Sequence, residues 1–161
     1  MVTKVLFPKI RLQEMLNRPG GISREDALSG AMENVRSISG EGDQQIEDAI
    51  VKIEAIAISR AKSQFSPEDL KAVLILADQI VTLAGTFGYS SLDRATKNLC
   101  DMADGLLHAD RGEAAPILVH VRAVRLFAPS ATALGEEESQ KVLAELEKIK
   151  MFYNFAALSS A

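Results

Sequence analysis

The chain has 161 residues, of which 47% are hydrophobic and 25% are charged. These proportions are typical of one soluble globular domain and argue against extensive disorder. Its 18 Lys and Arg against 22 Asp and Glu give a net charge of −4, which argues against a nucleic-acid-binding protein because such proteins need a basic surface. One cysteine excludes an internal disulfide. Two histidines and no Cys/His ligand pattern argue against a metal site, and nothing indicates a cofactor.

Apolar segments are too short for membrane insertion or secretion. The N-terminal apolar run resembles no signal peptide, and the longest run, residues 72–77, falls far below the ~20 residues of a membrane span. We therefore predict a cytoplasmic protein that does not associate with membranes. Because Trp is absent and aromatic residues are few, the core must consist of Ala, Leu, Ile and Val, which favours a helical bundle.

In chain order, prolines and glycines predict an extended arm over residues 1–22. Ser23 and Asp26 form a capping pair that begins an extra helix, and Gly40 and Gly42 are expected to end that segment, 23–42. Apolar residues at helical spacing follow and predict an amphipathic helix over 43–62. They are Ile46, Ile50, Ile53, Ile56 and Ala57.

The sequence Ser66-Pro67-Glu68-Asp69 is the clearest helix start, since it supplies a cap, a proline suited to the first turn and two acids. This helix should end at Gly88, where glycine tolerates a left-handed backbone. Two further helices follow to about residues 107 and 128, and a C-terminal helix is expected within 135–155. The prediction is an all-α single domain over 1–161. It contains an antiparallel four-helix bundle over 43–128 with additional terminal helices.

The helix that ends at Gly88 carries a recognisable pattern. Phe87 precedes the terminal glycine, and Ile80 stands eight residues before it. The next helix has leucines at sevenfold spacing, at positions 92, 99 and 106. Over residues 43–128 the chain resembles the histidine-containing phosphotransfer (HPt) domain of bacterial phosphorelays, whose helix reads H-x-L-K-G-x-x-x-x-φ-G, where φ is apolar.

The resemblance fails at the phosphoacceptor. Asp78 occupies the histidine position, Val81 the lysine position and Thr82 that of the following glycine. A carboxylate cannot form a phosphoramidate. No second acid lies within one helical turn of Asp78 to build the magnesium pocket that an aspartyl phosphate requires. The chain is therefore interpreted as a degenerate HPt-like protein that carries no phosphate at the usual position.

One side of this helix is expected to pack in the core, through Leu70, Val73, Leu74, Ala77, Val81, Ala84 and Phe87 or Gly88. The other side surrounds Asp78 and is a candidate docking face. Its members are Lys71, Ile75, Gln79, Thr82 and Gly85. The resemblance implies a response-regulator receiver domain or a histidine kinase as partner, in two-component or chemotaxis signalling. Two alternatives remain for this face: Asp78 is simply a solvated residue, or a terminal helix covers the face.

Other functions also stay open. His120 is an alternative phosphoacceptor, because Arg122 and Arg125 would favour a phosphoryl group near it. Its apolar neighbours favour a packed structural residue instead. A second alternative is a helical structural or oligomerisation module, and a homo-oligomer is possible. Enzymatic activity is not expected.

Overall fold

The computed structural model describes residues 21–153, without the side chain of Arg36, and this part contains six α-helices and no strand. The chain divides into two compact units between Asn34 and Val35, and each is described by itself. The helices are α2 (Arg24–Ser37), α3 (Ser39–Arg60), α4 (Pro67–Phe87), α5 (Ser90–His108), α6 (Ala114–Leu126) and α7 (Glu136–Tyr153). The predicted arm lies almost wholly outside the described residues, as do the last two residues of the predicted C-terminal helix. The all-α prediction is confirmed.

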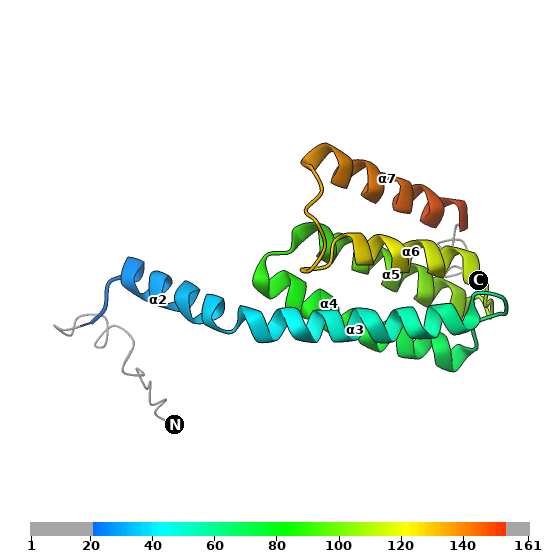
Figure 1. Cartoon of the computed structure of the whole chain (residues 1–161), viewed down its shortest axis with the longest axis horizontal. Coiled ribbons are helices and arrows are strands. Elements are labelled where there is room, and N and C mark those ends of the chain that lie inside the picture. The colour runs from blue at the N-terminus through cyan, green and yellow to red at the C-terminus, as the bar shows by residue number, and fades with distance from the viewer. Residues whose placement is uncertain (1–20, 154–161) are drawn as a thin grey trace, which may run out of the picture. The chain divides into compact units, whose positions relative to one another are not determined.

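The larger unit is a helical bundle. Helix α3 packs against α4, α4 against α5, α5 against α6, and α6 returns to α3, so each of these helices has two neighbours within this ring. Helix α7 lies outside this ring and contacts α5 and, less extensively, α6. Successive helices from α3 to α7 reverse direction (Figure 1). The shared core consists mainly of aliphatic side chains, as the composition predicted.

Helix α4 begins and ends where its local signals predict. The Ser66 hydroxyl accepts the Asp69 amide N–H at 3.2 Å, and the Asp69 carboxylate accepts the Ser66 N–H at 2.9 Å, which completes a capping box. At the other end Gly88 has a φ of 80°, the left-handed conformation that glycine adopts without strain.

The buried face of α4 differs in detail from the prediction. Its buried residues are Leu70, Val73, Ala77, Ile80 and Ala84. Ile80 belongs to the core, whereas Leu74 and Val81, which the spacing placed there, are only half-buried. The buried stripe of α4 therefore lies slightly to one side of the predicted one. Helix α4 packs between α3 and α5, and its contact with α5 is the more extensive.

The predicted end of the extra helix at Gly40 and Gly42 is wrong. Helix α3 already begins at Ser39 and includes both glycines, and the interruption lies at Ile38. Gly42 is buried, and a Cβ added to it would lie 1.9 Å from Cε2 of Phe87 on α4. A small residue is therefore needed here for close packing between helices and does not mark a helix end.

By length and composition alone, α4 is the one helix in the described part that is apolar enough to cross a membrane. Its apolar side chains have another explanation, because five of them lie in the protein core between α3 and α5. The helix also carries Glu68, Asp69, Lys71 and Asp78, which are costly to place in lipid. The place of α4 in the core therefore accounts for part of its apolar composition.

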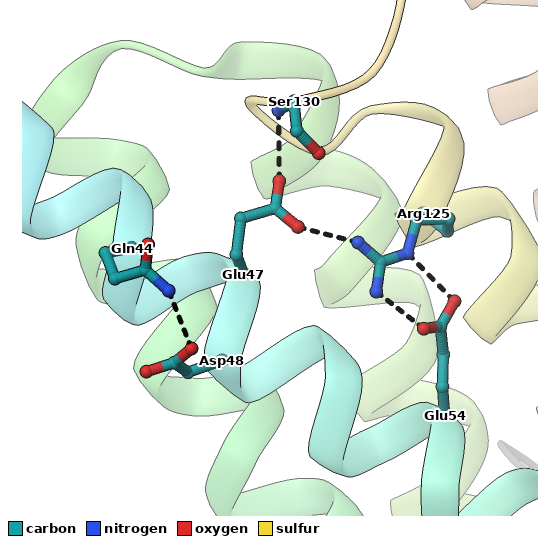
Figure 2. A network of polar contacts seen from close by, with 6 residues as sticks. All are labelled: Gln44, Glu47, Asp48, Glu54, Arg125 and Ser130. Atoms are coloured by element: carbon teal, nitrogen blue, oxygen red, sulfur yellow. Dashed lines mark hydrogen bonds and ion pairs between the residues drawn. The ribbon is translucent and has the colours of Figure 1, made fainter.

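Arg125 joins the two ends of the ring (Figure 2). Its guanidinium donates to both oxygens of Glu54, at 2.9 and 2.5 Å, and to Glu47 at 2.6 Å, so α6 is bound twice to α3. The other oxygen of Glu47 accepts the Ser130 backbone N–H at 3.0 Å. Burial alone would raise the pKa of Glu47, but the hydrogen bonds from Ser130 and Arg125 outweigh it and lower the pKa below its ordinary value.

We expect Arg125→Met to lower the free energy of unfolding by about 1–3 kcal/mol, because two half-buried carboxylates lose their shared donor. Urea unfolding at pH 7 measures the change. The loss should shrink as the pH falls below the ordinary pKa of Glu47, 4.5, because protonation removes the stabilisation that the lowered pKa represents.

Lys141→Met is the matched control. It removes an exposed pair with Glu137 on α7, and we expect a change below about 0.5 kcal/mol. Equal losses in the two variants would contradict a special role for Arg125.

Candidate functional site

The predicted docking face on α4 is open to solvent. Asp78 and the residues assigned to the face are all exposed. Ile75 shows 63% of its surface, a large fraction for an isoleucine. Within the larger unit, over residues 35–153, no helix covers this face, and the C-terminal helix α7 packs against α5 and α6 instead. The exposed set comprises Lys71, Ile75, Asp78, Gln79, Thr82 and Gly85. We call these six residues the α4 face.

A groove of about 450 Å³ runs along one side of the α4 face, between α3 and α4. From α4 it receives Asp78, Gln79 and Thr82, while Lys71, Ile75 and Gly85 are outside its lining. Its remaining residues are Gln45, Asp48, Ala49 and Lys52 of α3 and Leu83 of α4. Six of the eight lining residues are polar or charged, among them two carboxylates and one ammonium, and Ile75 is an exposed apolar residue of the same face.

Local hydrogen bonds decide which polar groups of α4 are available to a partner. The Thr82 hydroxyl donates to the backbone carbonyl of Asp78 at 3.0 Å, and the Thr86 hydroxyl donates to that of Thr82 at 2.8 Å. Both hydroxyls are therefore occupied within the helix. The Asp78 carboxylate has no hydrogen bond or ion pair among the described residues. It is a free acceptor on the face.

The other flank of Asp78 faces α5, where Cys100 is half-buried. Burial raises the pKa of the Cys100 thiol to about 11, and the charges of Asp101 and Asp78 act in the same direction. The thiol is therefore protonated at neutral pH and is a poor nucleophile. Cys100 packs as a small hydrophobic residue, and the negative potential around it extends to Asp78.

The two histidines lie away from the α4 face, in opposite environments. His108 ends α5 with an exposed side chain, whose Nδ1 lies 2.9 Å from the backbone carbonyl oxygen of Asp104 and 3.3 Å from its carboxylate. His120, on α6, is completely buried, and its Nδ1 lies 2.7 Å from the carbonyl oxygen of Pro116. A phosphoacceptor needs a solvent-exposed imidazole nitrogen. The burial of His120 thus agrees with the packed structural residue that its apolar neighbours favoured.

Sequence reasoning missed the α3 side of the groove. Gln45, Asp48 and Lys52 follow i, i+3, i+7 spacing and so form a polar stripe beside the buried residues of α3. The sequence shows this polar spacing, but it does not show which side of α3 packs against α4, because that depends on tertiary packing. Within the described residues, no group of three or more His, Cys, Asp and Glu is arranged to hold a metal ion.

Comparison with known proteins gives no relative for this chain: no family model, no curated protein and no solved structure matches it. The chemistry of the α4 face must therefore be judged from its own residues. An exposed aliphatic side chain, a free carboxylate and a shallow polar groove suit the recognition of another protein. The α4 face has no activated nucleophile, and the protonated thiol of the neighbouring Cys100 does not supply one.

The position of Asp78 next to α5 can be tested through Cys100. The raised pKa of Cys100 leaves little thiolate at pH 8, so alkylation by iodoacetamide should be much slower in the folded protein than in the urea-unfolded chain. Asp78→Asn removes one of the charges that raise the pKa and should accelerate alkylation of the folded protein.

Asp48→Asn is the matched control, because Asp48 lies in the groove but does not contribute to the pKa of Cys100. We expect it to leave the alkylation rate unchanged. Equal rates for Asp78→Asn and the wild-type protein would contradict the closeness of Asp78 to the thiol.

Proposed function

We propose that this protein is a signalling interaction protein of a bacterial phosphorelay, of the two-component or chemotaxis type. It binds a response-regulator receiver domain or a histidine kinase through the α4 face. It carries no phosphate there itself and changes phosphoryl flow by occupying its partner. The proposal places it in the cytoplasm, where such partners act. The exposure of Ile75 together with the unpaired carboxylate of Asp78 is the observation that carries it.

The helix arrangement supports this proposal. We infer that α3 to α6 form an antiparallel four-helix bundle of the HPt type, with α4 and α5 as its central hairpin. In support, α4 and α5 make the most extensive contact in the bundle, and Gly88 connects them by a tight turn. The residue at the phosphoacceptor position, Asp78, points outward on this hairpin, where a partner can reach it.

The chemistry of the face favours binding without phosphotransfer. Asp78 has no imidazole nitrogen to offer, and the groove brings it only one further acid, Asp48. Lys71 and Lys52 supply the positive charges of the region, and Ile75 supplies the apolar surface. Interfaces of this kind gain most of their affinity from a few central side chains, and charges at the rim steer the approach.

One observation favours the alternative of a helical oligomerisation module. Every described side chain of α2 is exposed, including Leu28, Met32 and Val35, which share one side of the helix. An isolated helix of this length is marginally stable in water. This alternative requires α2 to pair with another chain, and it makes no use of the α4 face.

The decisive experiment measures binding of the full-length protein to purified receiver domains and kinases by isothermal titration calorimetry. We expect Ile75→Asp and Asp78→Arg each to weaken binding tenfold or more, because each disrupts the centre of the α4 face. Ile58→Asp is the matched control, since Ile58 is also a largely exposed isoleucine, lies on α3 and is outside the groove.

A second arm adds a phosphorylated receiver and follows the label. We expect no stable transfer to the protein. The proposal fails if no receiver or kinase binds the wild-type protein, or if Ile58→Asp weakens binding as much as Ile75→Asp. Acid-labile, base-stable phosphate on His120 would instead establish the phosphotransferase alternative.

A further inference from the structure

Helix α7 is attached to the bundle by a narrow contact. Only Ser139, Leu143 and Leu146 of its 18 residues are buried. At its C-terminal end the Lys150 ammonium is held by Asp101 of α5 at 3.0 Å and by Glu147 of its own helix at 2.9 Å. Figure 1 shows α7 along the outside of α5 and α6. Such an element can open locally at a smaller cost than the ring of α3 to α6.

His120, on α6, is buried and interacts electrostatically with charged groups of both α5 and α7. Because the Pro116 carbonyl can only accept, Nδ1 carries the proton. In the neutral imidazole the lone pair therefore lies on Nε2. This Nε2 is enclosed and has no hydrogen-bond partner among the described residues. A buried polar atom without a hydrogen-bond partner is rare in folded proteins and destabilises the folded state.

The charged groups around His120 come from two helices. Asp101 faces it from α5, and Glu147 and Lys150 face it from α7. The acids of α3 that approach α6, Glu47 and Glu54, are bound to Arg125.

Burial is the largest cause that lowers the pKa of His120, and the Lys150 charge lowers it further. The hydrogen bond to Pro116 and the charges of Glu147 and Asp101 raise the pKa, but they do not outweigh burial. A proton on Nε2 would therefore be a poorly compensated charge inside the bundle.

We propose that α7 is an acid-sensitive clasp, which protonation of His120 releases from α5 and α6. Release gives the imidazolium access to water, while the core of α3 to α6 stays packed. The α7-docked state holds fewer protons at His120 than the released state. Docking is therefore complete above the usual imidazole pKa of 6.5 and weakens as the pH falls below it. Release also uncovers the apolar surface of α5 and α6 that Leu143 and Leu146 cover.

Hydrogen exchange of the full chain, followed by mass spectrometry between pH 7.5 and 5.5 and corrected for intrinsic rates, tests this proposal. We expect protection of α7 amides to fall, by up to about tenfold per pH unit for a one-proton transition, while α4 amides stay protected. Histidine is the side chain whose ordinary pKa lies inside this range, and the chain has two, His108 and His120.

The two histidines provide a matched pair of variants. His120→Gln should remove the pH dependence of α7 protection, and His108→Gln should leave it intact. NMR titration of the imidazole C–H signals in the wild-type protein adds a test that needs no variant: His120 should gain its proton in the same pH range in which α7 opens.

Three results would overturn the clasp. Loss of α4 and α7 protection together would show global unfolding. Persistence of the pH dependence in His120→Gln would show that another group controls it. Protonation of His120 with α7 still protected would separate the two events.

Discussion

The bundle depends on the contact that closes its ring, between α6 and α3. Their pairing brings together residues 71 to 78 positions apart, so its loop-closure entropy is higher than that of the α4–α5 hairpin. Apolar packing supplies most of the stabilisation, and Arg125 sets the register by binding one carboxylate with two parallel bonds and a second with one. Through Ser130, Glu47 also fixes the start of the connection to α7. A single guanidinium thus orients α3, α6 and the loop beyond them.

Local signals predicted α4 well, because its start and end are decided within a few residues. The capping box at Ser66 and the left-handed glycine at Gly88 act through bonds inside the segment. At Gly42 the same local reasoning failed. Glycine is a weak helix former, but here the ring of Phe87, 45 positions along the chain, occupies the place of a side chain. Tertiary packing overrode propensity, and no pattern within α3 reveals it.

Only the α4 part of the candidate site was predicted, because the rest of the site depends on tertiary packing. Periodicity along α4 separates exposed from buried residues, and it placed Ile75 and Asp78 outside correctly. The neighbours of Asp78 come from other helices, with Asp48 and Lys52 across the groove on α3 and Cys100 on α5. Which residues of two helices meet depends on their rotation about their axes, and periodicity in one helix cannot supply that. The burial of His120 belongs to the same class, since it depends on packing between α5, α6 and α7.

The α4 face and the α7 contact lie on different parts of the bundle and share one element. Helix α5 packs against α4, α6 and α7, whereas α7 has its contacts on α5 and α6. Asp101 illustrates the overlap, because it binds Lys150 of α7 and also raises the pKa of Cys100 beside Asp78. Any energetic coupling between a partner on α4 and the docking of α7 therefore has its shortest physical route through α5. Without movement of α5 the two surfaces are independent, and the effects of substitutions on them should add.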